Sequence, residues 1–423
     1  MRSDKDRTDP RPAGSPAAGD EVQVVSCAMV RDADEGEQRI ETIDSNDGTD
    51  VDVLLMRDGD PAATRRVTTD DFDPSDTVDP DQQIEELDLS RCALAISIES
   101  GRIDVALIAG HGEAVSAQRI PAAALTSGRD HADAIFGILT ESIDAVLHAV
   151  GIEPEDAGVL PGIGVVASGR VDPQGGTVSP AGGPPSAELA ESVAPTFTSA
   201  LGAWQSYPLR DRLSEHYGIG VRLLSPATAV CAGEHWRGAA RGRRNVLGIV
   251  LGHGIDGALV IDGRFVTGTT GNAGHIGHVC VDPYGPNCAC GGRGCLQAVA
   301  GGAAIADWAR SHGGDSLADA AAVAEAARRG DPVALATFRR AGEAIGQAVA
   351  GAVTLLDLDV VVIGGPLATV GPVLFDPMTD GYQRFAALSY AAPPRLVPAL
   401  LGGEGGQVGA AAAVLEPDTY PVG

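Results

Sequence analysis

The 423-residue chain has no run of about 18 uninterrupted apolar residues, the length that a membrane-spanning helix needs. Its charged beginning, MRSDKDRTDP, is not followed by the apolar stretch of a secretory signal. Seven cysteines, four of which are assigned to a metal below, suit a reducing compartment. We therefore predict a cytoplasmic protein that does not enter the membrane.

Positive charge is also scarce, with 30 Lys and Arg against 57 Asp and Glu and a net charge of −27. Residues 1–90 hold 25 acidic and 9 basic residues, a balance of −16. Affinity for DNA depends on basic side chains that neutralise phosphate, and no basic recognition helix is recognisable in this part of the chain. We predict that residues 1–90 are an acidic, largely disordered or irregular extension, with short strands beginning at Glu21 and Val51.

The rest of the chain is too long for one ordinary domain and alternates strand-like and helix-like segments, which indicates an α/β protein. Apolar residues at helical spacing predict helices over residues 131–150, 316–329 and 332–356, and a further helix from Leu209. Buried strands are expected over residues 159–168 and at the start of residues 360–371, where the strand ends in a Gly-Gly turn. Trp204 is interpreted as a packing aromatic, with a sugar-stacking platform as the alternative.

Residues 271–297 carry the strongest chemical signal, GNAGHIGHVCVDPYGPNCACGGRGCLQ. His278, Cys288, Cys290 and Cys295 offer one imidazole and three thiols, the soft ligand set of tetrahedral structural zinc. The intervening glycines allow the backbone to wrap closely around an ion. A disulfide is the alternative, but a Cys-x-Cys pair is a strained choice for one. Cys280, in a strand-like run, is interpreted as a small core residue.

The order Gly-His, nine residues, then Cys-x-Cys-Gly-x-x-Gly-Cys resembles the signature of the ROK family of repressors, open reading frames and sugar kinases. The resemblance extends over roughly residues 91–415. It implies an actin-like ATPase (ribonuclease H-like) fold with lobes at 91–227 and 228–404, followed by a closing helix and tail at 405–423. It also implies that a sugar binds between the lobes, and that His278 serves both zinc and ligand. We expect a homo-oligomer, namely a homodimer.

Both phosphate-binding turns of the family's kinases are altered. Where those kinases have Asp-x-Gly-Gly-Thr, this chain has SIESG at residues 97–101, so Glu99 brings a carboxylate to a place intended for phosphate. Where they have Gly-Thr-Gly-Ile-Gly, residues 252–256 read GHGID. We interpret His253 and Asp256 as turn residues, and a role of Asp256 as a substitute base as the less favoured alternative. The nucleotide-side candidates that remain are Gly252, Gly254, Gly364 and Gly365.

The sugar side is altered as well. The kinases' Asn-Asp-Ala-Asn-Ala, in which Asp is the general base, corresponds to residues 225–229, SPATA, and Pro226 cannot accept a proton. The Glu of Gly-Glu-x-Gly-His is His275 here, and the Glu after the last cysteine is Gln297. Imidazole and amide groups still form hydrogen bonds with hydroxyls. The sugar-binding candidates are Ser225, His275, His278 and Gln297.

These changes favour a non-catalytic ROK protein, a sugar-sensing or transcription-related regulator with structural zinc and without ATP or Mg²⁺. The alternative is an ATP-dependent hexose kinase with an atypical site. A third hypothesis is a scaffold in which the zinc element supports a homodimer and the acidic extension recruits a basic partner. Direct DNA binding, the identity of the sugar and the residual affinity for nucleotide stay open at this point.

Overall fold

The computed structural model describes residues 39–43, 50–57, 60–68, 87–99, 102–121, 131–179, 204–386 and 393–421. The chain divides into two compact units, and the boundary between them along the sequence lies between Leu87 and Asp88. The first unit contains one antiparallel sheet of order β1-β2-β3, formed by β1 (Arg39–Ile43), β2 (Asp50–Arg57) and β3 (Asp60–Thr68). Strand β2 covers the strand predicted from Val51, whereas the strand predicted from Glu21 lies outside the described residues.

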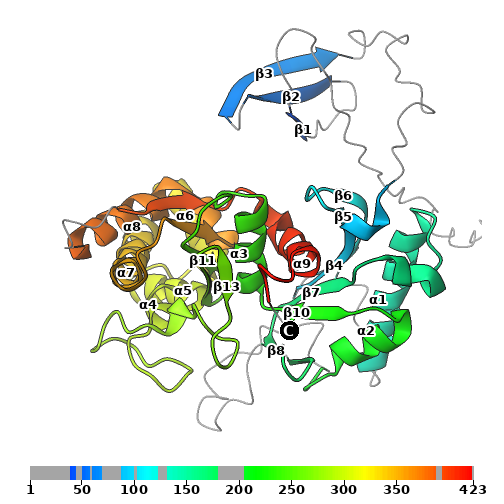
Figure 1. Ribbon diagram of the computed structural model, residues 1–423. Helices are drawn as coiled ribbons and strands as arrows, with labels where there is room; N and C mark the ends of the chain where they lie inside the picture. Colours follow the sequence, from blue (N-terminus) through cyan, green and yellow to red (C-terminus); the bar gives the residue numbers. More distant parts are fainter. Residues whose placement is uncertain are drawn as a thin grey trace, which may run out of the picture. The chain divides into compact units, whose positions relative to one another are not determined.

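The second unit contains two five-stranded sheets with the same topology. The first has the order β6-β5-β4-β7-β10 and the second the order β13-β12-β11-β14-β15. In each sheet the first three strands along the chain pair antiparallel, and the last two extend the sheet in parallel. A repeated strand order of this kind indicates two lobes built on one plan (Figure 1).

The central strands are apolar on both faces because helices cover both sides of each sheet. All seven residues of β4 are buried, as are all five of β7 and of β14. The first sheet comprises β4 (Cys92–Ile98), β5 (Arg102–Ala109), β6 (Ala114–Pro121), β7 (Ile163–Ala167) and β10 (Val221–Leu224). The second comprises β11 (Val246–Leu251), β12 (Ile255–Ile261), β13 (Arg264–Val266), β14 (Val360–Gly364) and β15 (Arg395–Pro398). The small pair β8 (Arg170–Asp172) and β9 (Thr177–Ser179) lies beside the first sheet.

Each lobe contributes a helix to the other. Helix α3 (Pro226–Trp236) follows the first sheet but packs against β11 and β12 of the second. Helix α9 (Gly405–Leu415) follows the second sheet but packs against β4 and β7 of the first. Figure 1 shows α3 and α9 side by side between the two sheets. The core of each lobe is therefore completed by a segment from the other half of this unit.

Helices α3 and α9 pack closely because the residues between them are small. A methyl group on Gly409 would lie 1.7 Å from the carbonyl oxygen of Ala229, and one on Gly233 would lie 2.4 Å from that of Gly405. Glu234, which is fully buried, accepts hydrogen bonds from the backbone N–H groups of Ala239 (2.7 Å) and Leu401 (2.8 Å). This carboxylate ties α3 to the segment that leads into α9.

The outer faces of the sheets carry the remaining helices, several at the predicted places. The first lobe has α1 (His131–His148) and α2 (Leu209–Tyr217), and the second has α4 (Leu296–Ala300), α5 (Gly302–Ser311), α6 (Ala320–Arg328), α7 (Pro332–Leu356) and α8 (Pro372–Phe385). Trp204 is fully buried, stacks on Tyr207 at 4.5 Å and donates to the carbonyl of Ala132, so it is a packing residue of the first lobe. Among the described residues, no helix is long and apolar enough to cross a bilayer.

Candidate functional site

The four predicted metal ligands lie together. The ligand atoms of His278, Cys288, Cys290 and Cys295 are all within 4.8 Å of one another. His278 ends a short 3₁₀ turn, η7 (Ile276–His278), and Cys295 caps the N-terminus of α4. Gly294 makes this closure possible: its φ is +64°, and a methyl group there would overlap the carbonyl of Asp282. The loop therefore requires glycine at this position.

The distances between donor atoms fit a tetrahedral ion. Cys288 Sγ lies 3.6 Å from His278 Nδ1, and Cys290 Sγ lies 3.7 Å from Cys295 Sγ. Zinc bonds of about 2.3 Å to sulfur and about 2.0 Å to nitrogen, at tetrahedral angles, imply separations of about 3.6 Å for sulfur and nitrogen and about 3.8 Å for two sulfurs. We call these four residues and their loop, residues 278–295, the knuckle; it is a Cys/His site that can hold a metal.

The environment of the donors is consistent with that role. Burial, and next the neighbouring His275, lowers the pKa of His278, which favours the neutral imidazole that a metal needs. The backbone N–H of Gly292 points to Cys290 Sγ and lowers the pKa of that thiol. Cys295 is buried, and desolvation raises the pKa of its thiol to about 12. Without a bound cation, this set of thiols would not ionise together.

Cys280 departs from its predicted place. Its side chain is exposed, so the prediction of a small core residue is wrong. The alternating pattern was misleading because Val279 is exposed as well and the segment forms only an isolated bridge to Cys295, not a strand of a sheet. Cys280 is not one of the four clustered ligands.

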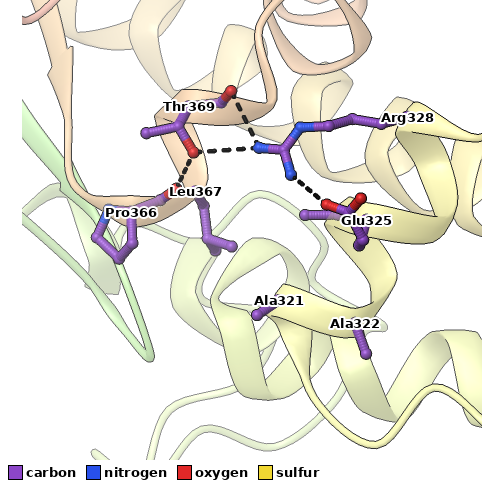
Figure 2. Close-up of a pocket in the computed structure, with 8 residues that line it drawn as sticks. Ala321, Ala322, Glu325, Arg328, Pro366, Leu367 and Thr369 are labelled. Atoms are coloured by element: carbon purple, nitrogen blue, oxygen red, sulfur yellow. Dashed lines mark hydrogen bonds and ion pairs between the residues drawn. The ribbon is translucent and has the colours of Figure 1, made fainter. Parts of the chain in front are cut away.

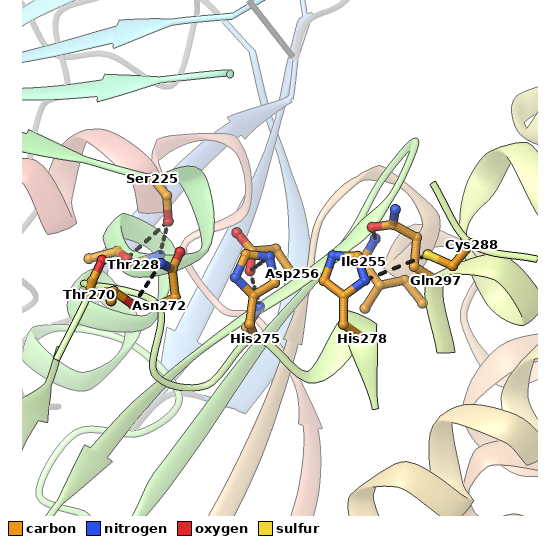
Figure 3. Close-up of polar contacts among 11 residues, drawn as sticks. Ser225, Thr228, Ile255, Asp256, Thr270, Asn272, His275, His278, Cys288 and Gln297 are labelled. Atoms are coloured by element: carbon orange, nitrogen blue, oxygen red, sulfur yellow. Dashed lines mark hydrogen bonds and ion pairs between the residues drawn. The ribbon is translucent and has the colours of Figure 1, made fainter. Parts of the chain in front are cut away.

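A polar cluster adjoins the knuckle. Ser225, Thr228, Asp256, His275, His278 and Gln297 appear together in Figure 3, from α3, β12, η7 and α4. Ser225 caps α3: its Oγ accepts from the backbone N–H of Thr228 (3.2 Å) and lies 2.9 Å from that residue's hydroxyl. Pro226 takes the first helical position, where proline suits helix geometry. Residues 225–229, which the sequence analysis compared with the kinases' general-base segment, therefore form a capped helix start.

Asp256 and His275 contact each other in this cluster. His275 Nε2 lies 3.3 Å from Asp256 Oδ1, and the same oxygen accepts from the backbone N–H of Gly257 at 2.7 Å. The side chains are 41% and 33% exposed, respectively, and the rings of His275 and His278 are 5.2 Å apart. The sequence analysis placed Asp256 in the turn, but it lies in strand β12, where it pairs with Val250. Its side chain is the partner of a sugar-binding candidate.

The turn between β11 and β12 is closed by its own neighbours. Gly252 N–H donates to the carbonyl of Gly254 at 3.0 Å, and Gln297 Oε1 accepts from the backbone N–H of Ile255 at 3.3 Å. The carbonyls of Gly252 and His253 accept from the first N–H groups of α5, at Gly302 and Ala303. The N–H groups of Gly252, Ile255, Gly302 and Ala303 are therefore hydrogen-bonded within the protein.

The corresponding turn of the first lobe is occupied by charges. Glu99 pairs with Arg102 at 3.3 Å, Arg102 with Asp104 at 2.6 Å, and Asp104 with Arg119 at 2.6 Å. Ser97 is buried, and the predicted tip at Ser100 and Gly101 lies outside the described residues. This network joins two acidic and two basic side chains, so it carries no net positive charge that would attract a triphosphate.

The Gly364–Gly365 turn after β14 leads into η8 (Pro366–Val370), which borders a pocket of about 420 Å³ against α6. Arg328 donates to Glu325 at 2.9 Å and to the carbonyl and hydroxyl of Thr369 at 3.2 and 3.3 Å (Figure 2). The lining is otherwise small and apolar and comprises Ala321, Ala322, Ala324, Pro366 and Leu367. A flat, largely apolar group fits this chemistry better than a phosphate does.

The sequence alone did not reveal two of these contacts, the pairing of Asp256 with His275 and the binding of Gln297 to the turn. A signal was available for the first. Both residues depart from the motifs of the family's kinases. Asp256 stands where the kinases have Gly and adds a carboxylate, whereas His275 stands where they have Glu and removes one. Paired changes of this kind can indicate contact, although one sequence does not show that the two residues meet.

The comparisons with known proteins agree with this architecture. A sequence model of the ROK family matches residues 95–416. Glucokinase from Thermotoga maritima is 32% identical over 278 residues, which cover 63% of this chain and 82% of that protein. The Escherichia coli transcriptional repressor Mlc is 29% identical over 214 residues, about half of each protein.

Among solved structures, a ROK hexokinase from Thermus thermophilus superimposes with a TM-score of 0.63 at 26% identity, covering 77% of this chain and 99% of the hexokinase. Relatives of both kinds, sugar kinases and a DNA-binding regulator, share this scaffold. The predicted two-lobed, actin-like ATPase fold with an acidic N-terminal extension is confirmed. The chain belongs to the ROK family.

Proposed function

We propose that this protein is a non-catalytic ROK protein that binds a sugar and acts as a sugar-sensing regulator. The proposal depends on Pro226, which by the family resemblance corresponds to the kinases' general base and which the structure places in a helix start that Ser225 caps. A positioned base contributes about 10²-fold or more to proton transfer, and proline has no group to supply it. Two further observations support the proposal from the phosphate side: the internal hydrogen bonds of the second lobe's turn, and the Glu99 carboxylate paired with Arg102 in the first lobe.

Sugar binding is the part of the family's activity that the polar cluster supports. Ser225, Thr228, His275 and His278 provide hydroxyl and imidazole groups suited to sugar hydroxyls. Gln297, also a sugar-binding candidate, uses its amide oxygen on the backbone of Ile255. In this proposal it holds the turn in place, and any contact with sugar comes from its amide nitrogen.

Zinc is the ion we propose for the knuckle. One imidazole and three thiols at these separations suit a tetrahedral ion with no open position, so a bound zinc would stabilise the loop and not activate water. A thiol-rich site of this kind also fits a reducing compartment such as the cytoplasm. Metal analysis of the purified protein should give one zinc per chain, and no metal in the C288S variant.

The decisive experiment is a coupled assay of ADP formation with Mg-ATP and a panel of hexoses and N-acetylhexosamines. We expect no turnover above background, whereas Thermotoga maritima glucokinase, as positive control, is active with glucose. Calorimetry with the same sugars should show binding in the absence of nucleotide. Turnover of any hexose by the wild-type protein would overturn the non-catalytic proposal.

The second candidate is a sugar kinase with an atypical base, and Asp256 is the observation that favours it, because a carboxylate beside His275 could accept a proton. This candidate predicts turnover that D256N abolishes and D262N retains. Asp262 is a suitable control because it follows the other end of β12, about 20 Å away at the usual rise per residue.

Regulation through DNA is a separate question. The repressor Mlc binds DNA, whereas residues 1–90 here carry a balance of −16 and would repel it. We propose that regulation acts through a protein partner and through a homodimer of this chain. Gel-shift assays with genomic fragments at low salt should show no retardation, and a shift would assign direct DNA binding.

A further inference from the structure

Asp256 gives the polar cluster a carboxylate. Its contacts with the Gly257 N–H and with His275 both engage Oδ1. A carboxylate offers about four acceptor positions, so capacity remains for a ligand. With its side chain one-third exposed, Asp256 is accessible and only partly desolvated.

Asp256 acts as a negative charge on this side of the cluster. Burial lowers the pKa of His278, His275 lowers it further, and the Asp256 carboxylate raises it. A zinc ion bound by three thiolates and one neutral imidazole would itself carry a net charge of about −1 next to His278.

We propose that the polar cluster binds an amino sugar with a free, protonated amine, and that Asp256 receives the ammonium group. The inference rests on the proposed sugar-binding function and names the chemical class of sugar. An ammonium and a carboxylate form a charge-assisted hydrogen bond that neutral hydroxyls do not match. A sugar phosphate would instead meet Asp256 and the knuckle as like charges and should be rejected.

The ligands that test this differ at one substituent. Glucosamine, glucose, N-acetylglucosamine and glucose 6-phosphate carry, respectively, an ammonium, only hydroxyls, a neutral amide and a phosphate. Binding is measured by calorimetry with the full chain at about pH 7. At this pH an amine with a pKa like that of an α-amino group is mostly protonated. We expect glucosamine to bind about fivefold more tightly than glucose, typical of a partly exposed ion pair, and the phosphate ester not to bind.

The matched variants are D256N and D262N, two identical changes of charge, one near the start of β12 and the other just after its end. D256N should reduce the ratio of glucosamine to glucose affinity to about one, whereas D262N should keep it. Increasing salt should reduce the ratio in the wild type, because a partly exposed ion pair is screened.

The outcomes separate this inference from the proposed function. Binding of glucose with no preference for glucosamine would overturn the inference and leave the non-catalytic proposal intact. A preference that D256N retains would also overturn it, because the ammonium would then be recognised elsewhere. Phosphorylation of either sugar would refute the non-catalytic proposal, while the affinity ratio and its loss in D256N would still decide the ligand class.

Discussion

The knuckle and the two turns at the predicted phosphate positions direct their polar groups differently. In the knuckle, three thiols and an imidazole converge on one point, with all four ligand atoms within 4.8 Å of one another. In the turns, amides, carbonyls and charges pair among themselves, through Gln297 and α5 in one lobe and through Glu99 and Arg102 in the other. The comparison separates a loop whose polar groups converge on a site for an ion from turns whose polar groups are bonded within the protein.

The largest effect should follow from breaking the knuckle. Replacing Cys288 by Ser removes a buried metal ligand, and loss of the metal should lower the free energy of unfolding by about 4 kcal/mol or more. Urea unfolding, with zinc content measured in parallel, checks this. The C280S variant is the control, because Cys280 is exposed and outside the ligand set. Equal losses in the two variants would contradict a metal-based role.

A second test compares the knuckle with a thiol that serves no metal. Cys231 on α3 is fully buried, and desolvation raises its pKa to about 12 from an ordinary value of 9. The neutral thiol is favoured in the folded state, so this stability is fully present below pH 9 and is lost as pH rises from 9 towards 12. The loss should be about 1.4 kcal/mol per pH unit, measured as unfolding free energy against pH, and absent from C231A.

Opening the turn of the second lobe should have an intermediate effect. Q297A removes the acceptor of the Ile255 N–H and should reduce stability by about 1–3 kcal/mol, because a backbone donor is left unpaired. Q297E keeps an acceptor and is the matched control. If Q297A were as stable as the wild type, the turn would not depend on this bond.

The smallest effect should come from the first lobe. E99Q breaks the partly exposed pair with Arg102 and should change stability by less than about 1 kcal/mol. Thermal unfolding at low and high salt measures this, and any difference should shrink as salt screens the pair. In the non-catalytic proposal, E99Q should not produce ATP turnover, since Pro226 and the closed second turn remain.

The sequence predicted the elements whose signals are local. Helix α7 (Pro332–Leu356) was predicted with its final boundaries from its apolar spacing, and the structure shows that Asp331 caps it and that Pro332 occupies the first turn. The metal ligands could also be predicted from the sequence, since three of the four lie within eight residues. Their convergence required only a tight loop.

The contacts that sequence reasoning missed join distant segments. Gln297 reaches a backbone N–H 42 residues away, and Asp256 reaches His275 across β13 and the loop that follows it. Cys280 alternates with two valines as a strand residue would, yet the segment has no sheet partner and the side chain faces solvent. Such contacts depend on which faces the tertiary fold brings together, and a single sequence does not specify them.

Because α9 covers the first sheet, the order of synthesis matters for this protein. The strands β4, β5 and β7 leave the ribosome early, but the helix that shields one face of that sheet is complete only when residue 415 has been made. Until then, one apolar face of the nascent first lobe has no permanent cover. A translation product that stops before α9 would keep this face open, as a natural substrate for chaperones and proteases.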